Sequence, residues 1–150
     1  MFLKNRLVIL PLLEGHCVKR ILVVEDELSI SNLISYNLEQ AGYRVVTAFD
    51  GTEAIHLIDR FSPHLVTLDL LLPLQSGWQV LDTIRRHPRK QIATLPVIVL
   101  SALSSPRLKK ELQNNGVDHC LGKPFSVTEL CLLVNTLLAE QVDSWWSSPL

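Results

Sequence analysis

The stretch His64-Leu65-Val66-Thr67-Leu68-Asp69 decides the fold, because it is an apolar run that ends in an acid. It follows Pro63, and its leucine and β-branched side chains are typical of a buried strand. An acid after a strand is common, so Asp69 alone indicates little. The prediction gains weight because other apolar runs in the chain end in the same way.

Three further apolar runs each lead into side chains that can do chemistry. Two of them are Arg20–Val24 and Leu95–Leu100, and the third lies around Cys120. The side chains that follow them are an acid pair, a hydroxyl and an amine: Glu25 with Asp26, Ser101, and Lys123. If the strands are parallel, these groups meet Asp69 at one edge of one sheet, where open α/β sheets bind ligands.

The composition indicates one globular domain with a covered sheet. The chain has 150 residues, of which 47% are hydrophobic and 19% charged. Its net charge of −1 lacks the basic excess of nucleic-acid-binding domains, so we expect no direct contact with nucleic acid. The cysteines Cys17, Cys120 and Cys131 are odd in number and lack metal-ligand spacing, which indicates reduced thiols and a cytoplasmic protein.

We expect a short extension on each side of the domain. Residues 1–18 are predicted to be a flexible N-terminal extension, residues 19–140 the domain, and residues 141–150 a C-terminal tail. The apolar run Leu7–Leu13 is broken by Pro11 and is shorter than the roughly 20 residues that cross a bilayer. We therefore predict no membrane association.

The hydrophobic period alternates between strand and helix along the domain. Besides the runs above, Tyr43–Ala48 predicts a strand, which brings the expected total to about five strands alternating with about five helices. The polar stretch His87–Thr94 is predicted to be a solvated loop. This alternation predicts an α/β fold: a single doubly wound parallel sheet with helices on both faces.

The three predicted neighbouring carboxylates, Glu25, Asp26 and Asp69, demand a cation. Two charges 4 Å apart repel by about 4 kcal/mol at an effective dielectric constant near 20. Oxygen ligands alone favour a hard ion, and Mg²⁺ fits best. A carboxylate beside Mg²⁺ can attack phosphorus, and Ser101 and Lys123 could neutralise the transferred oxygens. Taken singly, each residue also has a structural interpretation: a helix cap, a turn hydroxyl or a solvated charge.

From about Lys19 to Glu140, the sequence strongly resembles the receiver domain of two-component response regulators. The resemblance rests on four motifs: Ile-Leu-Val-Val-Glu-Asp-Glu at 21–27, Leu-Asp-Leu-Leu-Leu-Pro at 68–73 with Ser-Gly-Trp at 76–78, Leu-Ser-Ala at 100–102, and Lys-Pro-Phe at 123–125. As a set these motifs are highly specific. The resemblance implies a flavodoxin-like fold of five strands in the order 2-1-3-4-5.

The resemblance also implies a role for each residue of the predicted site. Asp69 would be the phosphoacceptor, and Glu25, Asp26, Asp69 and the backbone carbonyl of Leu71 would hold Mg²⁺. Ser101 and Lys123 would contact the phosphoryl group. The Lys123–Pro124 peptide is expected to be cis. Leu71 and Leu103 occupy the positions that flank the path of an attacking water in this family.

One position departs from the family pattern. A tyrosine or phenylalanine usually lies three residues before the lysine, and here that residue is Cys120, preceded by His119. The residues needed for phosphoryl chemistry are all present. The aromatic side chain that usually transmits activation to the surface of the fourth helix, fifth strand and fifth helix is missing.

We predict a stand-alone receiver that is not an enzyme, although it assists its own phosphorylation and dephosphorylation. It would take phosphate from a sensor histidine kinase or a phosphotransfer protein and signal by contact with a downstream protein. One alternative is a receiver-like binding module that works without phosphorylation, which Cys120 permits. A Mg²⁺-dependent phosphohydrolase is a weaker alternative, because neither a second catalytic acid after Asp69 nor a cap domain is present in the sequence.

Overall fold

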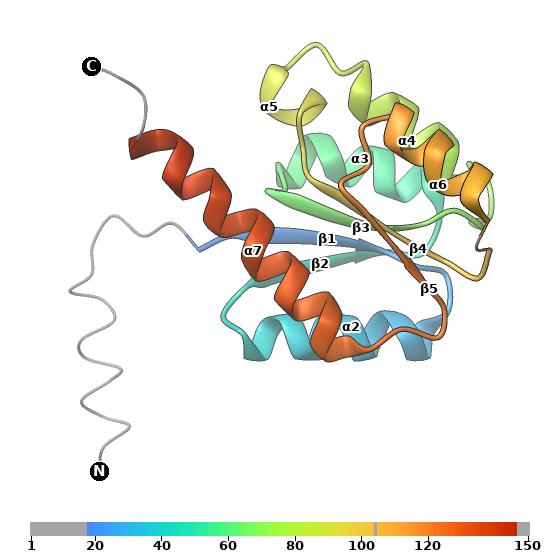
Figure 1. Ribbon diagram of the computed structural model, residues 1–150, viewed down its shortest axis with the longest axis horizontal. Coiled ribbons are helices and arrows are strands. Elements are labelled where there is room, and N and C mark those ends of the chain that lie inside the picture. The colour runs from blue at the N-terminus through green and yellow to red at the C-terminus, as the bar shows by residue number, and fades with distance from the viewer. Residues whose placement is uncertain (1–17, 104, 147–150) are drawn as a thin grey trace.

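The computed structural model describes residues 18–103 and 105–146, with side chains up to Glu140, and shows a sheet between two layers of helices (Figure 1). Residues 1–17 lie outside the described part, so the expected N-terminal extension stays a prediction. Val18, the first described residue, is 58% exposed. Among the described residues, no helix is both long enough and apolar enough to cross a membrane.

The sheet confirms the predicted topology. Its five strands lie in the order β2-β1-β3-β4-β5, and every pair of neighbours is parallel. The strands are β1 (Arg20–Val24), β2 (Arg44–Ala48), β3 (Leu65–Asp69), β4 (Val97–Ser101) and β5 (His119–Gly122). Because all five run the same way, their carboxyl ends share one edge of the sheet.

Two hydrophobic cores cover the two faces of the sheet. On one face, α3 (Gly51–Phe61), α4 (Gly77–Arg85) and α6 (Pro106–Asn114) pack on alternate strand residues such as Leu22, Val66 and Val99. On the other face, α2 (Leu28–Gln40) and α7 (Val127–Trp146) pack on residues such as Ile21 and Ile98. Every residue of β3 and β4 is buried, which explains why both strands are almost continuously apolar in sequence.

Local sequence signals set the helix ends. Ser105 caps α6 by accepting a hydrogen bond from the Leu108 N–H, and Pro106 occupies the first turn. Gly116, which follows this helix, has a φ of 73°, as expected for a glycine that ends a helix. A complete capping box between Ser76 and Gln79 begins α4.

The structure corrects one prediction and extends one element. The stretch predicted as a solvated loop contains a short helix, α5 (Lys90–Ala93), whose Ile92 is only 3% exposed. Ile92 is the one large apolar side chain in this stretch and shows no helical period, so the sequence did not reveal this helix. At the other end, α7 continues to Trp146, past the point where we expected the tail to begin.

His64, just before β3, is expected to make stability depend on pH. Its Nδ1 atom accepts a hydrogen bond from the Arg20 N–H at 2.9 Å, which requires the ring to be unprotonated there. Burial, assisted by the positive charges of Arg20 and Lys19, lowers the pKa of His64 to about 4. The unfolded chain, with a histidine pKa of about 6.5, takes up this proton first as the pH falls, so stability decreases between those two values.

After allowance for solvent screening, we expect His64 to contribute about 1–2 kcal/mol to the loss of unfolding free energy on acidification from pH 7 to pH 4.5. Urea unfolding across this range should show a smaller loss for His64→Asn, whose amide oxygen can accept the same N–H without titrating. Parallel pH curves for the two proteins would show that His64 is not the responsible group.

Candidate functional site

The predicted site residues lie together at the carboxyl edge of the sheet. Glu25 follows β1, Asp69 ends β3, Ser101 ends β4 and Lys123 follows β5. The Glu25 N–H donates to the Ala48 carbonyl at 3.0 Å, which extends the pairing of β1 with β2 past the strand end. The parallel sheet thus brings together residues that are up to 98 positions apart in the chain.

Glu25, Asp26 and Asp69 form the expected acidic cluster. One carboxylate oxygen from each residue lies within 4.8 Å of the others. Glu25 is 1% exposed and Asp69 is 6% exposed, while Asp26 is open to solvent. Burial is the main cause that raises the pKa of Glu25, and the negative charge of Asp69 adds to it. The cluster therefore combines two buried carboxylates with one, Asp26, that faces solvent.

Lys123 supplies the nearest positive charge. Its Nζ atom donates to Glu25 Oε2 at 2.6 Å and to Asp69 Oδ2 at 3.1 Å. Burial lowers the pKa of Lys123, but these hydrogen bonds outweigh burial and leave the pKa above its ordinary value. The Lys123–Pro124 peptide is cis, as expected, and the Lys123 N–H donates to the Ser101 carbonyl at 2.8 Å.

Backbone N–H groups hold the site side chains in place. The Leu71 N–H donates to Asp69 Oδ1, and the Leu103 N–H donates to Ser101 Oγ, each at 3.0 Å. The Glu27 N–H donates to Glu25 Oε1 at 3.1 Å, so Glu25 accepts from the residue just before α2, and the N-cap side chain of that helix makes no capping hydrogen bond. One Asp69 oxygen thus accepts from a backbone amide, and the other faces Lys123.

Gly77 lets the start of α4 pack directly against the backbone of Asp69, a role that sequence reasoning missed. A Cβ atom at this position would lie 2.3 Å from the Asp69 carbonyl oxygen, closer than real Cβ contacts allow. The Gly77 N–H also donates to the Leu70 carbonyl at 3.0 Å. In the sequence, Gly77 stood out only as part of the Ser-Gly-Trp motif at 76–78, and the requirement for close approach becomes visible once α4 and β3 are placed.

The donor set fits a hard divalent cation. The three carboxylates face one positive side chain, so the cluster carries an excess of negative charge that a cation would balance. Asp26 is exposed and can reach an ion without a change in the core.

Cys120 lies on β5 opposite Val99, half-buried, where the family usually has an aromatic side chain. Burial raises the pKa of its thiol, and the charge of Lys109 opposes this only in part. The thiol is therefore protonated at neutral pH and acts as a small apolar side chain. It packs against the core on the α3, α4 and α6 face of the sheet.

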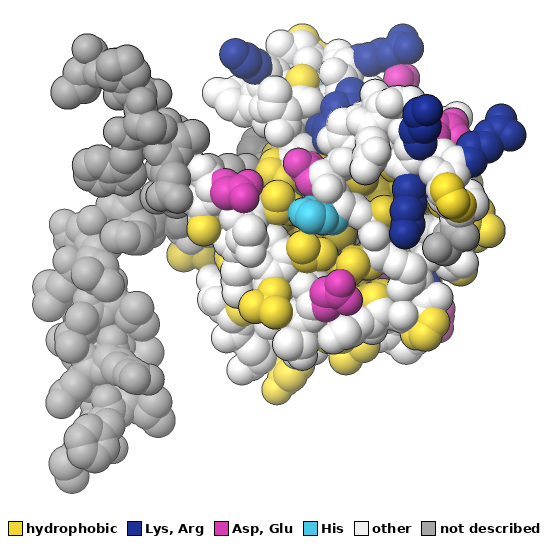
Figure 2. Space-filling view, viewed as in Figure 1, with side chains coloured by type: hydrophobic (Ala, Val, Ile, Leu, Met, Phe, Trp, Pro, Cys, Tyr) yellow, Lys and Arg dark blue, Asp and Glu magenta, His cyan; other side chains and the backbone are white. Residues whose placement is uncertain are grey.

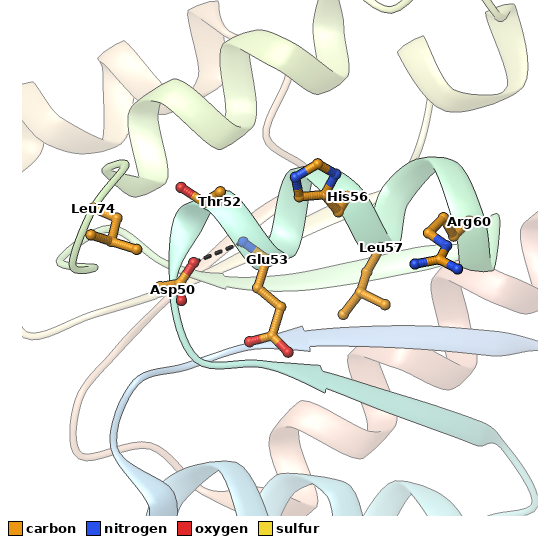
Figure 3. Close-up of a pocket in the computed structure, with 7 residues that line it drawn as sticks. All are labelled: Asp50, Thr52, Glu53, His56, Leu57, Arg60 and Leu74. Carbon is orange, nitrogen blue, oxygen red and sulfur yellow. Dashed lines mark hydrogen bonds between the residues drawn. The ribbon is translucent and has the colours of Figure 1, made fainter.

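A cavity of about 530 Å³ lies away from this site, along α3 (Figure 3). Its lining includes Asp50 and Glu53, and Leu74 from the loop before α4. The Asp50 carboxylate accepts from the Glu53 N–H, and the Glu53 carboxylate accepts from the Phe49 N–H. Both acids are thus used to begin the helix, and the cavity takes no part in the acidic cluster.

Comparison with known proteins identifies the family. A family model described as "Response regulator receiver domain" matches residues 21–135. The chain belongs to this family. Among curated proteins, the receiver is 41% identical over 119 residues to the "DNA-binding dual master transcriptional regulator RpaA" of Synechocystis sp., covering 79% of this chain and 48% of that protein. The chain thus spans about half the length of the curated relatives it matches.

Solved structures show the same fold. The signal receiver domain of a Luxo repressor protein from Vibrio parahaemolyticus superposes with a TM-score of 0.79 at 30% identity, covering 89% of this chain and 100% of that one. The receiver domain of a sensor histidine kinase from Pseudomonas aeruginosa, described with a magnesium ion in its active-site cleft, superposes at 0.72 with 26% identity and covers 82% of this chain and 99% of that one. These likenesses confirm the flavodoxin-like receiver fold.

Proposed function

We propose that this receiver accepts a phosphoryl group on Asp69 from the phosphohistidine of a sensor kinase or a phosphotransfer protein. The observation that carries the proposal is the position of the Lys123 ammonium between Glu25 and Asp69, directly beside the acidic cluster. A carboxylate next to a fixed cation and a cation-binding cluster is what phosphoryl transfer to an acid needs.

In the proposed step, an Asp69 carboxylate oxygen attacks phosphorus and forms a new P–O bond. The P–N bond to the donor histidine breaks, and the ring nitrogen keeps its electron pair. Lys123 stabilises the charge on the transferred oxygens, and the Ser101 hydroxyl donates to one of them. The Leu71 N–H keeps the second Asp69 oxygen oriented.

Glu25, Asp26, Asp69 and the Leu71 carbonyl would hold Mg²⁺ in this proposal. The ion, when bound, supplies positive charge to the phosphoryl oxygens. The same residues that favour phosphorylation would assist the loss of phosphate, without a separate substrate. The output would be contact with a downstream protein in the cytoplasm. Our expectations that the chain binds neither membrane nor nucleic acid stay predictions.

Intact-mass measurement after incubation with acetyl phosphate tests the proposal. We expect a gain of about 80 Da, one phosphoryl group, with Mg²⁺ present and no gain when EDTA removes it. A single gain that is equal with and without the divalent ion would contradict the proposed site. Absence of any gain would favour the binding module that works without phosphorylation, which Cys120 at the aromatic position permits.

Leu71 and Leu103 are expected to make the phosphorylated state long-lived. Their N–H groups bind Asp69 and Ser101, so both residues sit beside the reacting groups, with side chains 60% and 54% exposed. Neither side chain can hydrogen-bond a water for in-line attack. The Leu71→Asn/Leu103→Glu variant should lose phosphate about tenfold faster, a barrier change of about 1.4 kcal/mol.

Phosphate release from purified, labelled protein measures this rate. A matched control is Leu33→Glu/Leu132→Asn, which changes exposed leucines on α2 and α7 in the same chemical way. The control should keep the wild-type rate. An unchanged or slower rate in the Leu71 and Leu103 variant would show that these leucines do not shield the phosphoryl group.

A further inference from the structure

The loop that follows Asp69, residues 70–76, is fastened to the start of α3. The Gly51 N–H, at the first position of α3, donates to the Pro73 carbonyl at 3.3 Å. Among the described residues, this is the only hydrogen bond that residues 72–75 make. The first N–H groups of a helix have no partner within the helix, so the loop pairs a donor that the helix leaves free. Figure 3 shows Leu74, from this loop, beside the start of α3.

Gly51 leaves no room for a side chain between α3 and this loop. A Cβ atom at Gly51 would lie 2.0 Å from the Gln75 carbonyl oxygen and 2.7 Å from the Gln75 Cβ atom. The nearest atom belongs to the backbone, so it could not turn aside as the end of a flexible side chain would. At Gly42 and Gly122, by contrast, an added Cβ atom would meet nothing within 4 Å. A side chain at position 51 would therefore displace the loop.

Leu74 has a backbone conformation that its side chain does not explain. Its φ of 66° lies in the left-handed region, which leucine rarely adopts, and its side chain is 79% exposed, so burial does not offset this strain. Figure 2 shows hydrophobic side chains at several separate places on the visible face, so the exposure of one leucine does not by itself indicate a partner. The contacts of Pro73 and Gln75 with Gly51, on either side of Leu74, account for the strained backbone.

The fastened loop carries groups that act on the phosphoacceptor. The Leu71 N–H donates to Asp69 Oδ1 at 3.0 Å, and the Leu71 carbonyl would hold Mg²⁺ in the proposed function. The Gly77 N–H closes the loop by donating to the Leu70 carbonyl at 3.0 Å. Because both ends of the loop are held together in this way, a displacement at Gln75 must be absorbed by the residues between them, which include Leu71.

We propose that Gly51 is a positioning residue for the phosphoacceptor site. By leaving space for the loop and donating its N–H to it, Gly51 fixes the place of the Leu71 peptide beside Asp69. Gly51 contacts neither the phosphoryl group nor the ion and acts through the loop. The inference rests on the proposed function, because the metal site that Gly51 supports is the one proposed above. A glycine with a merely structural role would change the stability of the protein without changing its affinity for Mg²⁺.

Melting temperatures of the full chain, measured without metal and over a series of Mg²⁺ concentrations, separate these two roles. The metal-free value reports stability, and the rise with Mg²⁺ gives the Kd, because an ion that binds only the folded protein stabilises it by an amount set by its concentration relative to the Kd. For Gly51→Ala we expect a lower metal-free melting temperature and Mg²⁺ binding weakened by about tenfold, as for other residues that orient a metal ligand.

The matched control is Gly42→Ala, the same substitution at the end of α2. Gly42 has a φ of 97°, so an alanine there is strained, yet its Cβ atom would meet nothing within 4 Å. This variant should also have a lower metal-free melting temperature, but its Mg²⁺ affinity should equal that of the wild type. The control thus reproduces a loss of stability without a displacement of the loop.

Wild-type Mg²⁺ affinity in Gly51→Ala would overturn the positioning role and leave the proposed function intact. An equal loss of affinity in Gly51→Ala and Gly42→Ala would do the same, because affinity would then follow stability. A wild-type melting temperature that does not respond to Mg²⁺ would overturn the proposed metal site, and the positioning role with it.

A second variant, Gln75→Gly, tests the contact from the loop side if Gly51→Ala does not fold. It removes the side chain that lies next to Gly51 and gives the loop backbone more freedom. We expect it to weaken Mg²⁺ binding by about threefold, in the same direction as Gly51→Ala. An unchanged Mg²⁺ affinity in a folded Gln75→Gly protein would likewise overturn the positioning role.

Discussion

The Asp69→Asn variant is expected to gain no phosphoryl group under conditions in which the wild-type protein gains one. An amide oxygen is a far weaker nucleophile than a carboxylate oxygen. In the wild-type protein the Lys123 ammonium lies 3.1 Å from Asp69 Oδ2. In the variant it would face either an amide N–H₂ group, which is a donor, or an uncharged oxygen. The substitution preserves the size of the side chain and an acceptor for the Leu71 N–H, so the fold should persist.

A matched control for this experiment is Asp82→Asn, which removes an exposed acid on α4 that pairs with Arg86. It should be phosphorylated as wild type is. Circular dichroism and a melting curve establish that the Asp69→Asn protein is folded before its mass is compared. Equal phosphorylation of the folded variant would remove Asp69 from the proposed role and revive the interpretation as a binding module.

The sequence predicted the features that depend on the spacing of apolar residues and on the polar side chains at the ends of strands. The parallel sheet follows from four apolar runs, and the cluster of Glu25, Asp26 and Asp69 follows once those runs are aligned at one edge. The order of the strands did not follow from the pattern. It came from the resemblance, because hydrophobic period indicates which residues are buried but not which strands are neighbours.

Contacts to backbone atoms were the main omission. The close approach of Gly77 to Asp69 and the N–H groups of Leu71 and Leu103 have no side-chain signature in the sequence. The helix α5 was missed for a related reason, since Ile92 is its one buried residue and a single buried position gives no helical period. Such features depend on where the backbone runs, and a sequence pattern does not specify that.

Arg85 is the strongest case of a structural role hidden from the sequence. In the sequence it is simply the first of two adjacent arginines at the end of α4. In the structure its guanidinium donates hydrogen bonds to four backbone carbonyls. They belong to two segments: Ala93 and Leu95 at the end of α5, and Asn115 and Gly116 after α6, at distances between 2.6 and 3.2 Å. Burial lowers the pKa of Arg85, and the charge of Asp118 opposes this.

We expect Arg85→Met to lower the unfolding free energy by about 2–3 kcal/mol, because several charge-assisted hydrogen bonds are lost and partly buried carbonyls keep no donor. Arg85→Lys should lose most of the same energy, since an ammonium cannot reach both segments in the planar arrangement of a guanidinium. Arg86→Met is the matched control: the Arg86 side chain is 80% exposed and, among the described residues, forms an ion pair with Asp82 alone, so the change should alter stability by about 0.5 kcal/mol or less.

Urea unfolding of the three variants measures these differences. Equal losses for Arg85→Met and Arg86→Met would show that the carbonyl contacts contribute no more than a surface ion pair. If Arg85→Met loses clearly more stability than Arg86→Met, the Arg85 guanidinium stabilises the fold by joining the end of α4 to the segments that follow α5 and α6.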